Sequence, residues 1–134
     1  MKKILPFLFL VLFISCKKEK ENAPLVLNFQ KILEKYLICD SIKVKSGGVT
    51  TVQVIGKGNG EDLRFHSDAS YTIYSNPQQI RSFQLTPPDR LYYYDDVLDP
   101  NTYYLVTSLT ETKLVLQKND AIASAVYTRY FSVE

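Results

Sequence analysis

The chain has 134 residues, with 46% hydrophobic and 22% charged residues, and its 16 basic residues nearly balance 14 acidic ones. This length suits one domain, and the sequence lacks the clustered basic surface that nucleic-acid binding requires. Two cysteines are too few for a disulfide framework.

The first 16 residues have the composition of a secretory signal. Lys2 and Lys3 form a short basic start, residues 4–14 are almost all apolar, and the small residue Ser15 follows. The apolar run is shorter than the roughly 20 residues that a membrane-spanning helix needs. The sequence therefore predicts a signal peptide at residues 1–15, whose removal would leave equal numbers of basic and acidic residues.

Residues 12–16 (LFISC) place a cysteine directly after this signal. The order resembles a bacterial lipobox, with Phe13 where Leu is commoner. The resemblance implies that Cys16 becomes the first residue and carries acyl chains, which hold the protein on a membrane. The alternative is an ordinary secretory signal with an incidental cysteine.

Residues 17–24 are polar and charged and end in proline, which predicts a tether between the anchor and a folded domain. Lys17 does not resemble the aspartate-type signal that retains some lipoproteins in the inner membrane. We therefore expect a cell-envelope protein, with the outer membrane favoured over the inner one.

Residues 25–36 predict the one helix, because their apolar residues recur on a single helical face. We expect this face to pack against the domain. Its members are Leu25, Phe29, Ile32, Leu33 and Tyr36.

From residue 37 onward the pattern changes to short β-rich segments separated by turns, without a helix between them. Such spacing predicts an all-β fold, an antiparallel up-and-down meander barrel of about eight or nine strands. The expected strands are 38–45, 49–55, 63–66, 71–74, 80–85, 90–94, 102–109, 113–117 and 125–133.

Alternation along the strands predicts which side chains face inward. The last strand places Arg129 among apolar residues, so the orientation of that strand stays open. The expected inward residues are Leu63, Phe65, Tyr71, Ile73, Phe83, Leu85, Leu114, Leu116, Tyr127, Phe131 and Val133.

Two stretches resemble a known family. Residues 63–71 (LRFHSDASY) are similar to a strand–turn–strand motif of small bacterial lipocalin-like domains, with Ala69 where glycine is usual. Residues 104–110 (YLVTSLT) and 114–116 (LVL) are similar to the late hairpin of that family. The resemblance spans residues 25–134 and implies a meander barrel attached by a lipid, but it implies no particular ligand.

No constellation of residues predicts catalysis, a cofactor or a metal centre. His66 is the single histidine, and its neighbours Ser67 and Asp68 are adjacent in sequence, whereas a catalytic triad must converge in space. We expect His66 at the surface or in a turn, and Cys39 as a buried small hydrophobe.

The segment 95–101 carries oxygen-rich side chains that could bind calcium. Their order does not match an EF-hand loop, and the same residue types form ordinary turns. The residues concerned are Asp95, Asp96, Asp99 and Asn101.

The ten tyrosines are the best remaining functional feature, because tyrosine combines an apolar body with a polar tip. We hypothesise a non-enzymatic protein that binds a small apolar or amphipathic ligand in the barrel. The alternative is an accessory protein whose exposed tyrosine-rich face docks on another envelope component, and a third view takes the tyrosines as ordinary strand residues. The candidate ligand-binding residues are Phe65, Tyr71, Tyr93, Tyr104 and Tyr127.

Overall fold

The structure, a computed structural model, describes residues 25–93 and 103–134. The predictions about Cys16, the tether and the acidic segment 95–101 lie outside the described residues. The elements are α1 (Leu25–Gln30), β1 (Leu37–Ser46), β2 (Val49–Val54), β3 (Leu63–Phe65), β4 (Ser70–Ile73), β5 (Gln79–Thr86), β6 (Arg90–Tyr93), β7 (Tyr103–Leu109), β8 (Lys113–Asp120) and β9 (Ala125–Val133).

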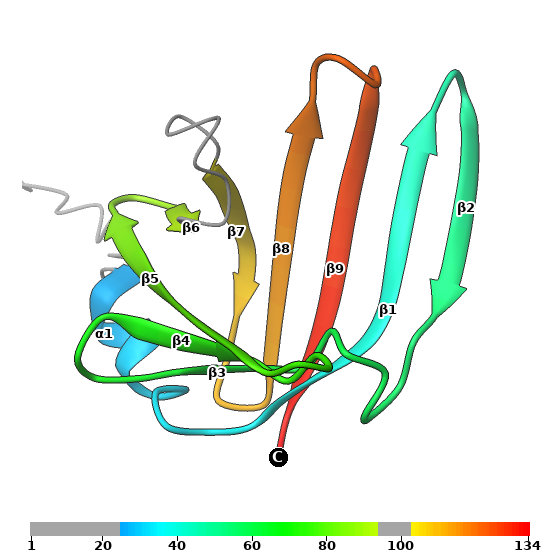
Figure 1. The fold of residues 1–134 in the computed structure, drawn as a ribbon. Helices are drawn as coiled ribbons and strands as arrows, with labels where there is room; N and C mark the ends of the chain where they lie inside the picture. Colours follow the sequence, from blue (N-terminus) through cyan, green and yellow to red (C-terminus); the bar gives the residue numbers. More distant parts are fainter. Residues whose placement is uncertain (1–24, 94–102) are drawn as a thin grey trace, which may run out of the picture.

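The strands form one antiparallel sheet in the order β2-β1-β3-β4-β5-β6-β7-β8-β9, and pairing of β1 with β9 closes it into an eight-stranded barrel with β2 as an extra strand. Figure 1 shows β8, β9, β1 and β2 side by side as tall strands, with β3, β4, β5 and α1 gathered at one end. The predicted all-β meander barrel with one short helix is therefore confirmed.

Strand β1 changes neighbours along its length. Near its start Leu37 pairs with Leu63 of β3, and farther along β1 pairs with β2. A bulge at Asp40 separates the two parts, because Cys39 pairs with Phe131 and Ser41 with Tyr130. A bulge adds one residue and shifts the alternation, which explains why the strand only partly alternates in sequence.

The helix is shorter than predicted. It ends at Gln30, whereas the apolar periodicity predicted it to Tyr36. Glu34 adopts a left-handed conformation with φ of 60°, and its N–H donates to the Phe65 carbonyl oxygen at 2.7 Å rather than continuing a helix. A tertiary hydrogen bond thus ends the helical turn, although Leu25, Phe29 and Ile32 are still buried as expected.

The core fills the barrel at the end where α1 lies. The ring of Phe29 from α1 contacts those of Phe65 and Phe83, with centroids 4.9 and 5.6 Å apart. Cys39, which pairs with Phe131, is fully buried in the same core, as predicted. The aliphatic part of this core comprises Ile32, Leu37, Leu63, Leu91, Leu114 and Leu116.

Candidate functional site

A cavity of about 220 Å³ opens where the short strands end and the tall strands continue. We call it the barrel mouth. Inward side chains of β3, β4, β5, β7 and β9 form it together with the loop before β3, because residues two apart on a strand face the same side. Its lining consists of Gly60, Glu61, Leu63, Tyr71, Ile73, Ser75, Gln79, Tyr104 and Arg129.

Strand β9 explains why the mouth is amphipathic. Its inward residues pass from Phe131, which is buried in the core, to Arg129 in the mouth and then to Tyr127. The guanidinium of Arg129 forms an ion pair with the Glu61 carboxylate from the loop before β3. The position of Arg129, which the sequence left open, is therefore inward, where the core gives way to the mouth.

Further basic side chains surround this region. Register with Tyr71 places Arg81 on the inward face of β5, where its Nη2 donates to the Gln79 side-chain oxygen at 2.5 Å. The ammonium of Lys118 lies 5.7 Å from the ring centroid of Tyr104, a cation–π arrangement. The mouth thus combines apolar walls with arginine and tyrosine groups, and a lysine ammonium lies against one of the tyrosines.

The structure brings together some of the predicted ligand-binding residues. Tyr71 and Tyr104 line the mouth, whereas Phe65 is buried in the core beneath it. Tyr127 faces inward beyond Arg129 but does not line the cavity, and the side chain of Tyr93 lies outside the described part of the chain.

Sequence reasoning missed Glu61 and Gln79 as mouth residues. Glu61 lies in a loop, where no strand alternation predicts the direction of a side chain. Its partner, Arg129, comes 68 positions later in the chain. Gln79 stands just before the predicted strand at 80–85, so its inward position needed the observed register with Ile73.

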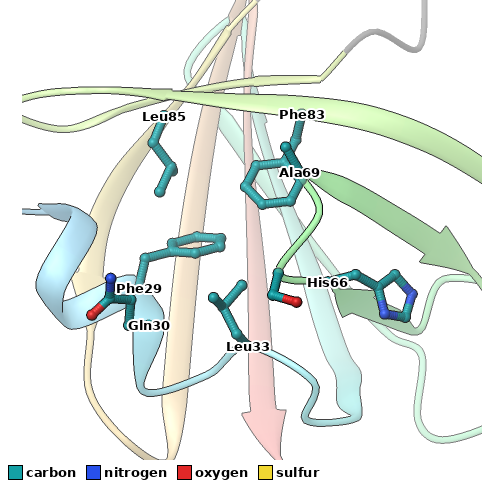
Figure 2. Close-up of a pocket in the computed structure, with 8 residues that line it drawn as sticks. Phe29, Gln30, Leu33, His66, Ala69, Phe83 and Leu85 are labelled. Carbon is teal, nitrogen blue, oxygen red and sulfur yellow. The ribbon is translucent and has the colours of Figure 1, made fainter.

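A second cavity, of about 210 Å³, lies at the other ends of β4 and β5. We call it the end cavity. Figure 2 shows the aromatic ring of Phe29 and the side chains of Leu33, Phe83 and Leu85 around it, with Gln30 and His66 at its edge. Ser67 and Ala69 complete the lining.

His66 takes part in a relay that superficially resembles a catalytic triad. Its Nδ1 lies 2.9 Å from a Glu34 carboxylate oxygen and its Nε2 lies 2.8 Å from the Thr72 hydroxyl. The hydrogen bonds from His66 and the Ser67 N–H lower the pKa of the Glu34 carboxyl below its usual value. Thr72 is only 3% exposed, and its hydroxyl is engaged by His66, so the relay links β4 to the segment that follows α1.

The buried carboxylate of Asp62 is likewise structural. It accepts hydrogen bonds from the Tyr36 hydroxyl at 2.7 Å, the Cys39 N–H at 2.9 Å and the Gly58 N–H at 2.7 Å. Burial and this carboxylate raise the pKa of Tyr36 to about 12. The contacts fasten the loop after β2 to the start of β1.

In the described ranges, no group of three or more histidine, cysteine or acidic side chains could hold a metal ion, and no helix there is long and apolar enough to cross a membrane. Comparisons with protein families, with curated proteins and with solved structures found no match.

Proposed function

We propose that the protein is a lipid-anchored cell-envelope protein that binds a small amphipathic ligand in the barrel mouth. The observation that carries the proposal is the convergence of Tyr71, Tyr104 and Arg129, from three strands, on one cavity. Mouths of β-barrels are common ligand sites, and such sites combine apolar walls with a few polar groups.

The lining indicates the chemistry of the ligand. Leu63 and Ile73 offer apolar contact, and Arg129 and Tyr104 offer polar contact. Among the described residues, Arg129 lines the mouth, and Arg81 and Lys118 lie beside its lining residues Tyr71 and Tyr104. Glu61 is the acidic residue in that part of the lining, which favours a ligand with an anionic head. The cavity is smaller than the roughly 300–1,000 Å³ that drug-sized ligands fill, so the ligand is small or inserts one end only.

A defined amphiphile tests this site. All core residues that the structure describes lie between Leu25 and Phe131, so a soluble chain beginning at residue 17 retains them. We expect octanoate to shift the ring NMR signals of Tyr71 and Tyr104 saturably. Tyr92, whose strand position faces outward, is the control, and equal shifts at Tyr92 or none at Tyr71 would contradict the proposal.

The anchor has its own test. Cys16→Ser should release the protein from membranes and abolish incorporation of a fatty-acid analogue, because the thioether that carries the acyl chains cannot form. Cys39→Ser is the matched control and should leave both properties unchanged. Retention and labelling of the Cys16→Ser protein would exclude the anchor.

The second candidate is an accessory protein that docks on another envelope component. The outward Tyr92 and Tyr103 rings lie 5.5 Å apart with the Arg90 guanidinium over Tyr103, but both tyrosines are half-buried. The extra strand β2 offers a more exposed apolar surface, since Val52 and Val54 are 59% and 81% exposed.

An exposed, uncharged outer strand can pair with an extended segment of another protein. On this second candidate, Val52→Lys should abolish crosslinking of the protein to a neighbour in the intact envelope. Ile80→Lys, at a somewhat more exposed position on β5, should leave the crosslink intact. Loss in neither variant, or in both, would count against docking through β2.

A further inference from the structure

We propose that the end cavity is a second binding site, which takes a neutral group the size of one aromatic ring or a six-carbon chain. The site is separate from the barrel mouth, because Phe83 and Leu85 of β5 line the end cavity whereas Gln79 of the same strand lines the mouth. The proposal therefore stands whether or not the mouth holds a ligand.

The walls of the end cavity are apolar and held in place. Phe29, Leu33, Phe83 and Leu85 surround it (Figure 2). The Phe29 and Phe83 rings also pack on Phe65, with centroids 4.9 and 5.0 Å away. A cavity whose walls are fixed before binding loses little conformational freedom when a ligand enters.

The edge of the cavity is fixed by hydrogen bonds. The Glu34 carboxylate accepts from the Ser67 N–H at 2.9 Å and contacts His66 Nδ1 at 2.9 Å. The Phe83 N–H donates to the Ala69 carbonyl oxygen at 2.9 Å. The turn between β3 and β4 is thus tied both to β5 and to the segment that follows α1.

Two residues with a strained backbone conformation lie at this edge. In the described part of the chain, three non-glycine residues have positive φ, and two of them are Glu34 at 60° and Ala69 at 63°. The left-handed region is costly for a residue with a Cβ, and glycine adopts it without that cost. Ala69 lines the cavity, so the strained residue supplies a methyl group that glycine would lack. Strain retained beside a cavity motivates a functional hypothesis.

The polar groups at the edge indicate a neutral ligand. Both ring nitrogens of His66 are engaged, one with Glu34 and one with Thr72. The Glu34 carboxylate disfavours an anion nearby, and the exposed amide of Gln30 offers only neutral hydrogen bonding. An apolar cavity of about 150 Å³ can bind benzene, so about 210 Å³ suits one ring with a small polar substituent.

Benzyl alcohol is the probe that tests this site. In methyl NMR spectra of the chain from residue 17 onward, we expect saturable shifts at Ala69, Leu33 and Leu85. Benzoate, the anion of the same size, should produce at least tenfold weaker binding. The absence of saturable shifts at these methyl groups, or equal binding of benzoate, would overturn the proposal.

Substitutions that fill the end cavity test whether benzyl alcohol binds there. Leu33→Phe should fill it and abolish the response, and Leu85→Phe should do the same from β5 if the first variant unfolds. Ile80→Phe, on the outward face of β5, should bind as the parent does. Benzyl alcohol binding that survives both filling variants would overturn the proposal.

Ala69→Gly tests the role of the strained methyl group. Relief of strain should raise the melting temperature by several degrees. Loss of the methyl contact should weaken benzyl alcohol binding about fourfold, the fold-change that corresponds to about 0.8 kcal/mol for one buried carbon. A higher melting temperature with unchanged affinity for benzyl alcohol would contradict the proposed role of the Ala69 methyl group.

Discussion

Replacement of Asp62 by alanine should strongly destabilise the barrel. The change leaves the N–H of Cys39 without an acceptor in a fully buried position, which costs about 1–3 kcal/mol. It also removes the charge-assisted hydrogen bonds that Tyr36 and Gly58 donate. Each of these bonds contributes about 1 kcal/mol or more, even though water can partly replace the carboxylate at these partly buried positions. Together we expect the free energy of unfolding to fall by about 3–5 kcal/mol.

Equilibrium unfolding in urea, followed by circular dichroism and tyrosine fluorescence since the chain has no tryptophan, measures this loss. Asp68→Ala is the matched control, because Asp68 is exposed and accepts locally from the N–H and hydroxyl of Ser70. The control should lose much less stability than Asp62→Ala, because its partners are exposed to water. A loss below about 1 kcal/mol for Asp62→Ala, or one equal to that of the control, would refute the reasoning.

Three further predictions concern β1 and its flanks. The pKa of Tyr36 rises from 10.0 to about 12 on folding. The stability that its protonated hydroxyl contributes is therefore present below pH 10 and is lost as pH rises to 12. Urea titrations should show this decline in the free energy of unfolding, and the decline should be smaller in Tyr36→Phe. Burial raises the pKa of the Cys39 thiol to about 11, so iodoacetamide at pH 8 should modify it only after unfolding, and rapid labelling of the native protein would contradict its burial. Gly48 has φ of 79° with no neighbouring atom within 4 Å of an added Cβ, so Gly48→Ala should cost about 1 kcal/mol through backbone strain alone, and an unchanged urea midpoint would contradict this.

Alternation made most of the barrel predictable from sequence. Leu114 and Leu116 face inward on β8 as expected, and so do Tyr71 and Ile73 on β4. The end of the helix was not predictable in the same way. The left-handed conformation of Glu34 accompanies a hydrogen bond to β3, and local periodicity carries no information about such a distant partner.

The candidate site was predictable only where it lies on strands. Tyr71 and Tyr104 have the residue type and the strand positions that suit a pocket, and both line the mouth. The Glu61–Arg129 pair depends on closure of the barrel through β1 and β9, which brings together residues from a loop and from the last strand. The end cavity depends on how α1 packs against β5, a tertiary arrangement without a sequence motif.

The central claim is that the barrel mouth holds a small molecule. Native mass spectrometry of the chain from residue 17 onward, purified from its own host, tests it most directly when repeated for Ile73→Trp and Ile80→Trp. The first variant fills the mouth, and the second adds the same ring at an exposed outward position. With Leu33→Phe in all three proteins to fill the end cavity, we expect an added mass that leaves on denaturation in the parent and in Ile80→Trp but is absent in Ile73→Trp. A parent without added mass on this background, or an added mass that persists in Ile73→Trp, would contradict binding in the mouth.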